Sequence, residues 1–308
     1  MDVRSLSEDP GLYDEVRKLI NRTLFNDFID RRLFRLLTVD DPNFDPKLSL
    51  VCLRSGKVVA TAMGIRRIKE PSSMVDKQRE IAWIKVLACP PDRTAELGNL
   101  IAVLEEELRR SGARMVRVSD YASWYLSPGI DLEYEWLRAL LEHLGYGKVG
   151  EAVNYEVDMS KYRTPSWVQK LESELRQQGF VLREASIQDQ DRLYEWIERV
   201  FSPFWRIEAE LAMRSEEGGV LIAEKGGVIA GFSVYGALRP DFFGPIGVDP
   251  GVRGRGLGTV LLFRTLERMR EEGVRVATIP WTLHLTFYAQ VPGVTKIRLF
   301  NVVAKELA

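Results

Sequence analysis

The sequence has few of the residues that build metal centres or disulfide frameworks. Its 308 residues include two histidines, His143 and His284, and two cysteines, Cys52 and Cys89. Metal sites usually need three or four such ligands, so we expect no metal centre. Two cysteines so far apart with apolar neighbours indicate buried free thiols in a reducing compartment.

The sequence also lacks a charge excess of either sign and a long apolar run. It contains 43 Lys and Arg against 44 Asp and Glu, a net charge of -1 that gives no general attraction to nucleic acid or to an anionic membrane. No apolar run approaches the about 18 residues of a membrane-spanning helix. The opening MDVRSLSEDP lacks the basic and apolar parts of a secretory signal. We expect a cytoplasmic monomer or homodimer without nucleic-acid or membrane partners.

What the chain does have is the composition of a soluble globular protein, 45% hydrophobic and 28% charged. Its length predicts two domains of about 150 residues. Both halves follow one order of predicted elements: a strand, a helix, a β-hairpin, a further strand, a long amphipathic helix, another strand, a short helix and closing β sequence. Three pairs of residues around the long helices are each 160 residues apart: Pro90 and Pro250, Arg93 and Arg253, Gly98 and Gly258.

This repeat predicts a mixed α/β fold (α+β mixed sheet) made of two tandem units, each a mixed central sheet flanked by helices. Pro165 precedes a new stretch of helical periodicity, so the predicted domains are residues 1–164 and 165–308.

The segment DPGVRGRGLGTVLL, residues 249–262, combines glycine, arginine and the start of a helix. A helix N-terminus presents unpaired amides and partial positive charge, and glycines let an anion approach the backbone. A flexible helix entry with exposed arginines is the alternative. Neither G-x-x-x-x-G-K-[ST] nor G-x-G-x-x-G occurs here, which disfavours a mononucleotide kinase or a dinucleotide reductase.

The segment resembles the acyl-CoA signature R/Q-x-x-G-x-G/A of the GNAT N-acetyltransferase superfamily, with Arg253, Gly256 and Gly258 in its fixed positions. The superfamily's order of elements also matches both halves. The resemblance implies acetyl-CoA as cosubstrate, its pantetheine arm along Ile246, Gly247 and Val248, with the Val248 amide directed at the thioester carbonyl. It also implies that the pyrophosphate is held by one run of backbone amides: Arg253, Gly254, Arg255, Gly256, Leu257, Gly258 and Thr259.

TFYAQVPG resembles the superfamily's F-Y-x-x-x-G-F element, whose tyrosine protonates the departing thiolate, and this implies that role for Tyr288. An additional residue before Gly293 and Trp281 in place of a frequent asparagine depart from the pattern, and a core position is the alternative. For the general base we select Asp241, just before the fourth strand of its half, ahead of Glu224. An ordinary turn explains Asp241 equally, and His284 lies either in the cleft or in solvent.

The first half departs from the signature, with Thr94, Ala95 and Glu96 where the second half has Gly254, Arg255 and Gly256. A carboxylate at this turn would repel a diphosphate, so we expect no CoA site there. Leu141 stands where Tyr288 would be. Three aromatic residues of this half either line an acceptor pocket or belong to the core: Trp124, Tyr125 and Trp136.

The predicted function is acetyl transfer from acetyl-CoA to a primary amine of a small molecule by direct attack in a ternary complex. Similarity to transferases of amino-sugar metabolism suggests an amino sugar. A CoA-binding sensor without turnover is the alternative from another class, and a tRNA-dependent peptide transferase is disfavoured by the near-neutral charge.

Overall fold

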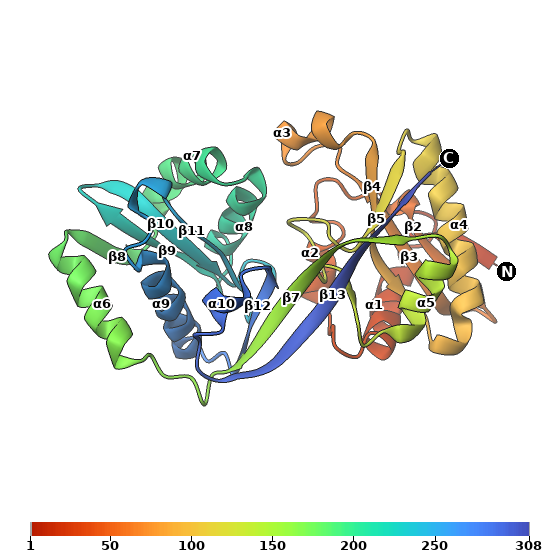
Figure 1. The fold of residues 1–308 in the computed structure, drawn as a ribbon. Coiled ribbons are helices and arrows are strands. Elements are labelled where there is room, and N and C mark those ends of the chain that lie inside the picture. Colours follow the sequence, from red (N-terminus) through yellow and green to blue (C-terminus); the bar gives the residue numbers. More distant parts are fainter. Residues whose placement is uncertain (1, 308) are drawn as a thin grey trace. The chain divides into compact units, whose positions relative to one another are not determined.

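The computed structural model describes residues 2–307, which divide by their contacts into two compact units. Unit 1 runs to Ala152 and also includes the chain from Leu299 onward, and unit 2 is Val153–Arg298. The mixed α/β fold, with a mixed sheet flanked by helices, is as predicted (Figure 1), whereas the four-stranded sheet of unit 2 is antiparallel. This division differs from the predicted boundary at 164/165 because Val153–Asp158 pair with a strand of unit 2 and Val303–Glu306 pair with a strand of unit 1.

Unit 1 is built around strands whose order is β1, β2, β3, β4 and β5, followed by the end of β13. All neighbours are antiparallel except β4 and β5. The strand bounds are β1 Asp2–Ser5, β2 Ser49–Arg54, β3 Lys57–Arg66, β4 Ile81–Ala88, β5 Met115–Val118, β6 Ile130–Asp131 and β13 Val294–Glu306. The helices are α1 Leu12–Thr23, α2 Arg31–Leu36, α3 Ser72–Val75, α4 Thr94–Arg110 and α5 Glu135–His143, with 3-10 turns η1 Pro46–Leu48, η2 Asp76–Gln78 and η3 Pro91–Arg93.

Helix α4 packs on β2 and β3 because its apolar residues recur every three or four positions. This periodicity puts one stripe of fully buried side chains on the sheet: Leu97, Leu100, Ile101, Leu104 and Leu108. The predicted free thiols are also confirmed, since Cys52 and Cys89 are both buried and unbonded.

Unit 2 contains a four-stranded antiparallel sheet in the order β11, β10, β9 and β8. The strands are β8 Phe180–Glu184, β9 Gly219–Lys225, β10 Val228–Tyr235, β11 Phe243–Val248 and β12 Val276–Thr282, and β12 pairs with β7, Gly147–Asp158. The helices are α6 Ser166–Gln177, α7 Gln190–Val200, α8 Pro203–Met213, α9 Leu257–Glu271 and α10 Leu285–Tyr288, with 3-10 turns η4 Ile187–Asp189 and η5 Pro250–Val252.

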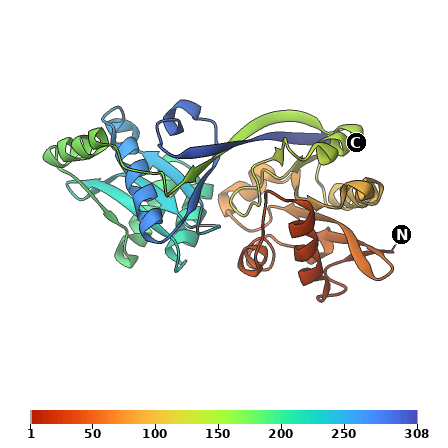
Figure 2. The ribbon, with the colours of Figure 1, turned by 90° about the horizontal axis from the view of Figure 1, so that it is seen from below.

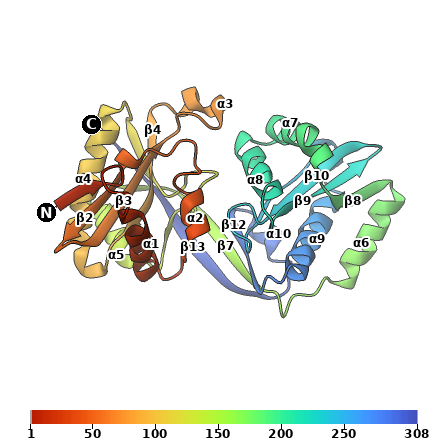
Figure 3. The ribbon, with the colours of Figure 1, turned by 180° about the vertical axis from the view of Figure 1, so that it is seen from behind.

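Strand β9 shows how alternation builds the layers of unit 2. Val220 and Ile222 belong to the core beneath α7 and α8, whereas Leu221 and Ala223 belong to the core beneath α6 and α9. Successive side chains of a strand point to opposite faces, so each face receives its own pair of helices. Figure 3 shows α7 and α8 on one side of this sheet, and Figure 2 shows the green α6 beside the blue α9.

The strands β11 and β12 of unit 2 meet only where they begin. Phe242 bridges to Thr278 in parallel orientation, and the Thr278 amide donates to the Asp241 carbonyl at 2.7 Å. Beyond that point β11 pairs only with β10, and β12 pairs with β7. The equivalent strands of unit 1, β4 and β5, instead pair over Ile81–Ile84. In unit 2 the edge of β11 that faces β12 is therefore left without a ladder partner in the part of the chain that the structure describes.

Candidate active site

The turn between β11 and α9 is shaped by left-handed glycines. Gly254 has φ +78° and Gly256 has φ +83°, conformations that disfavour any residue with a Cβ. Asp249 fixes the entry to this turn, because its carboxylate accepts from the Gly251 amide at 2.8 Å. Helix α9 then begins at Leu257.

The backbone amides from Arg253 to Thr259 have no hydrogen-bond acceptor among residues 2–307. The first later amide with a partner is that of Val260, which donates to the Gly256 carbonyl at 3.1 Å. Unpaired amides at the first turn of a helix, aligned with its dipole, form an anion site. The exposed Arg255 adds positive charge beside them, whereas Arg253 donates from Nε to the Val248 carbonyl at 3.0 Å.

The space around each glycine of the turn differs. A Cβ on Gly256 would lie 2.6 Å from Leu171 Cδ2 on α6, so this glycine lets α6 pack against the turn. A Cβ on Gly258 would lie 3.5 Å from Val248 Cγ2, an ordinary contact, and one on Gly254 would meet nothing within 4 Å. The backbone conformation alone therefore accounts for Gly254, while Gly256 is also required by the packing of α6.

The free edge of β11 presents two outward amides, one of them the Val248 amide considered above. The Asp249 amide donates to the Ala230 carbonyl on β10 at 2.9 Å. Because amides alternate between the two edges of a strand, those of Val248 and Ile246 point away from β10. Gly247 lies between them, and a Cβ there would lie 2.6 Å from Phe201 Cζ. An extended ligand along this edge would find two amide donors directed toward it.

Helix α10 brings Tyr288 to the start of β11. The Tyr288 ring packs against Phe243 with ring centroids 6.3 Å apart, while Phe287 approaches the start of α9 near Gly258. Tyr288 is buried, with 8% of its surface exposed, and burial raises its pKa to about 12, partly opposed by a hydrogen bond with Thr282. Its hydroxyl therefore stays protonated at neutral pH and can act as a proton donor.

The carboxylates considered as a base are held by arginines. Both oxygens of Asp241 accept from Arg239, at 2.9 Å each, where β11 and β12 meet. Glu224 pairs with Arg183 at 2.8 Å and with Arg192 at 2.7 Å. The Glu224 contacts join β9 to β8 and α7, whereas the Asp241 contact is local to the turn before β11. The third polar candidate, His284, is exposed before α10, and its backbone amide donates to Thr282 Oγ1 at 3.0 Å.

A strained bulge near Tyr288 was not predicted. Trp281 has φ +49°, and the pairing of β12 with β7 shifts register between Ile279 and Thr282. The buried Asn154 holds the bulge, because its Oδ1 accepts from the Trp281 amide at 2.9 Å. Bulges and left-handed non-glycine residues concentrate at functional sites. The sequence signal was the departure at Trp281 from the usual asparagine of this element.

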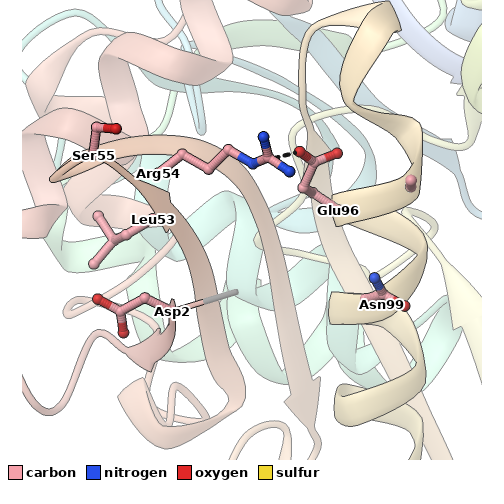
Figure 4. Close-up of a pocket in the computed structure, with 7 residues that line it drawn as sticks. Asp2, Leu53, Arg54, Ser55, Glu96 and Asn99 are labelled. Atoms are coloured by element: carbon pink, nitrogen blue, oxygen red, sulfur yellow. Dashed lines mark ion pairs between the residues drawn. The ribbon is translucent and has the colours of Figure 1, made fainter.

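In unit 1 the corresponding turn is helical and contains a carboxylate side chain, that of Glu96. Helix α4 begins at Thr94, so residues 94–96 form its first turn where unit 2 has the glycine loop. Glu96 accepts from Arg93 at 3.3 Å and lies 3.0 Å from Arg54 Nε (Figure 4). A hydrogen bond from its own amide lowers the pKa of Glu96, assisted by these arginines. The adjoining pocket of 450 Å³ is lined by Asp2, Leu53, Arg54, Ser55, Ala95, Glu96 and Asn99.

The other residues singled out in unit 1 are mostly core. Trp124 and Tyr125 are each 4% exposed and Leu141 is 1% exposed, whereas Trp136 is half-buried. Among residues 2–307, no three His, Cys, Asp or Glu side chains gather as a metal-binding group. Over the same residues, no helix is both long and apolar enough to cross a membrane.

Comparison with known proteins finds a family model that matches part of unit 2. Residues 187–285 match the model of the acetyltransferase (GNAT) family, which includes α7 through β12 and the glycine turn. A search of curated protein sequences finds no match.

Solved structures resemble the chain over nearly its whole length. A GCN5-related N-acetyltransferase from Sphaerobacter thermophilus has TM-score 0.67 and 18% identity, covering 99% of this chain and 95% of its own. A tandem GNAT protein from the clavulanic acid biosynthesis pathway has TM-score 0.65 and 16% identity, covering 99% and 98%. A GCN5-related glucosamine N-acetyltransferase region of a fungal multi-domain β-N-acetylglucosaminidase has TM-score 0.76 and 16% identity; the match covers 99% of this chain and 38% of that one. These likenesses show a shared fold.

Proposed function

We propose that this chain, which contains a domain of the acetyltransferase (GNAT) family at residues 187–285, transfers the acetyl group of acetyl-CoA to a primary amine of a small molecule. The observation that carries the proposal is the run of unpaired amides from Arg253 to Thr259 at the start of α9. They would hold the pyrophosphate, with Arg255 as a nearby counter-charge.

The free edge of β11 supports the same assignment. The pantetheine arm would lie along Ile246–Val248, where two amides point outward. The Val248 amide would then donate to the thioester oxygen as negative charge develops there. Attack by the amine forms the C–N bond, and cleavage of the C–S bond releases a thiolate that Tyr288 protonates.

Acetyl-CoA binding is assigned to unit 2 alone. In unit 1 the first turn of α4 fills the position of the loop, and Glu96 supplies a carboxylate where the diphosphate would stand. Repulsion between these anions, together with the absent left-handed turn, supports a first unit that binds no CoA.

The acceptor proposed for the first test is an amino sugar, since one similar structure is described as a glucosamine N-acetyltransferase region. We further propose that the protein acts in the cytoplasm as a monomer or homodimer without nucleic-acid or membrane partners. The near-zero net charge and the absence of membrane-spanning helices over residues 2–307 fit this assignment.

Calorimetry with acetyl-CoA, followed by an assay of thiol release with a panel of amines that includes glucosamine, tests the function. We expect one acetyl-CoA per chain and thiol release that requires an amine. Acetylated product should appear by mass spectrometry. Tight binding of acetyl-CoA without thiol release from any amine would instead indicate a CoA sensor.

A further inference from the structure

An open pocket of 920 Å³ lies at the end of α9 opposite the glycine turn, and three arginines line it. Arg270 belongs to the last turn of α9, Arg275 directly precedes β12, and Arg163 lies between β7 and α6. All three segments belong to unit 2. Because α9 has 15 residues and each adds about 1.5 Å to its length, the pocket is about 20 Å from the turn assigned to the pyrophosphate. The proposed function makes no use of this pocket.

The chain around Arg163 is held firmly against α9. Tyr162 is fully buried, and its hydroxyl donates to the Phe263 carbonyl in the middle of α9 at 2.7 Å. The Asp158 carbonyl accepts from the Tyr162 amide at 3.1 Å, which closes the turn after β7. The Arg163 guanidinium donates from Nη1 to the carbonyls of Ser160, at 2.9 Å, and Tyr162, at 2.6 Å. This guanidinium is therefore positioned without a carboxylate, and its Nε and Nη2 donors have no partner among residues 2–307.

The other two guanidinium groups of the pocket also lack a close carboxylate. Glu267 lies 3.9 Å from Arg270 and makes a much closer contact with Arg264, at 2.6 Å. Arg275 is exposed, and its side chain forms neither a hydrogen bond nor an ion pair with any residue from 2 to 307. The pocket thus contains three positive charges that the protein neutralises only weakly.

The acidic residue that lines the pocket, Asp158, is engaged by its own turn. Its Oδ1 accepts from the Ser160 amide at 3.0 Å and from the Ser160 hydroxyl at 2.6 Å, and its Oδ2 lies 3.3 Å from Lys161 Nζ. The hydrogen bonds from Ser160 lower the pKa of Asp158. This carboxylate is therefore ionised at neutral pH, and it balances Lys161 rather than the three arginines.

Most arginines of unit 2 are paired much more closely. A carboxylate oxygen lies within 3.3 Å of the guanidinium in each of these: Arg176, Arg183, Arg192, Arg206, Arg214, Arg239, Arg264 and Arg268. Arg253 and Arg255, beside the glycine turn, have no such contact within residues 2–307. Arginines without a close carboxylate thus gather at two places in unit 2, the turn assigned to the pyrophosphate and the pocket at the far end of α9.

The end of α9 opposes an anion only weakly. Gly273 ends the helix at φ +88°, and its amide donates to the Arg270 carbonyl at 3.0 Å. The Val274 amide donates to the Met269 carbonyl at 3.0 Å. This Schellman motif occupies two of the carbonyls that a helix end leaves unpaired. The remaining dipole amounts to about half a negative charge, which the three guanidinium groups outweigh.

We propose that this pocket binds the phosphate group of a small phosphorylated metabolite. Guanidinium groups match phosphate oxygens through paired N–H donors and stay charged over the whole neutral range. Val274 and Val276 also line the pocket and offer apolar surface to the organic part of the ligand, and the volume is that of a small-molecule site. Asp158 can accept a hydrogen bond from a hydroxyl group of the ligand, which favours a sugar phosphate over a polyphosphate.

Isothermal titration calorimetry of the full chain with glucose 6-phosphate tests the site. We expect one glucose 6-phosphate per chain and no binding of glucose, which lacks the charged group. Arg275→Glu should raise the Kd by about tenfold or more at low salt, with an unchanged melting temperature because the side chain has no partner to lose. Arg199→Glu, which reverses an exposed arginine of α7 outside the pocket, is the matched control and should leave the Kd within about twofold. The Kd of the wild type should also rise as pH falls below about 6 and the phosphate dianion takes up a proton.

Arg255→Glu distinguishes this pocket from the glycine turn. Weaker binding of glucose 6-phosphate in Arg255→Glu but not in Arg275→Glu would place the phosphate in the turn, which overturns the pocket and leaves the proposed function intact. A wild type that binds glucose 6-phosphate no more tightly than glucose also overturns it. Binding that Arg275→Glu weakens and saturating acetyl-CoA leaves unchanged supports a second, separate site. The same result in a chain that acetylates no amine would keep the pocket while the proposed function fails.

Discussion

Glu96 and Arg54 form an ion pair at 3.0 Å at the start of α4, where the equivalent turn of unit 2 presents unpaired amides. The contrast comes from the backbone as well as the side chain, since residues 94–96 are helical while Gly254 and Gly256 are left-handed. The same fold thus carries an open turn in one unit and a filled turn in the other.

Glu96→Gly should therefore leave the stoichiometry of acetyl-CoA at one per chain. Removing the carboxylate frees amides of α4 but does not create the left-handed loop, because Thr94 and Ala95 remain in the first turn. Isothermal titration calorimetry of wild type and variant checks this. A second binding event in the variant would show that Glu96 alone closes the site in unit 1.

Gly256→Ala should destabilise the protein more than Gly254→Ala. In both variants a left-handed alanine lowers the free energy of unfolding by about 1–2 kcal/mol. Only the Cβ at position 256 would also lie 2.6 Å from Leu171. That overlap should lower the free energy of unfolding by about 1–3 kcal/mol more. Urea unfolding of the two variants measures the difference. Leu171→Ala in the Gly256→Ala background should recover part of the additional cost. Equal destabilisation by the two glycine variants would refute the contact with α6.

Arg255→Glu should weaken acetyl-CoA binding without changing thermal stability. The side chain is exposed and forms no ion pair within residues 2–307, so the folded state loses nothing. Near the diphosphate, however, the reversed charge should raise Kd by about tenfold or more at low salt and less at high salt. Titrations at two ionic strengths test this, with Arg270→Glu, at the opposite end of α9, as the control. An unchanged Kd would place the diphosphate elsewhere.

The features of this site that depend on neighbouring residues in the sequence could be predicted. The features that depend on contacts between distant segments could not. The glycine turn lies in a short motif that leads into the start of α9. Tyr288 lies in a second short motif, which forms α10. The bulge at Trp281 depends on Asn154 from a distant strand, which no periodicity reports.

The acidic residues show the same division. Arg239 stands two positions from Asp241, so the pairing that occupies this carboxylate was visible as a local signal. Glu224 instead pairs with Arg183 and Arg192, which lie about 40 and 30 residues away in the sequence, and only packing reveals those contacts. The last strand, β13, adds its end to unit 1, a choice of long-range pairing that sequence alone does not specify.

Tyr288→Phe should lower kcat by about 10²–10⁴-fold and leave acetyl-CoA binding within about twofold, because the ring still packs against Phe243. The pH dependence of wild type should show no loss from this group until pH approaches its pKa of about 12. The folded state raises that pKa above the about 10 of an unfolded tyrosine, so its contribution to stability is complete below pH 10 and is lost as pH rises toward 12. A tyrosinate absorbance titration of wild type minus variant measures the midpoint, and thiol release measures kcat. A midpoint near 10, or a variant with wild-type kcat, would remove Tyr288 from the reaction and leave it as a core residue.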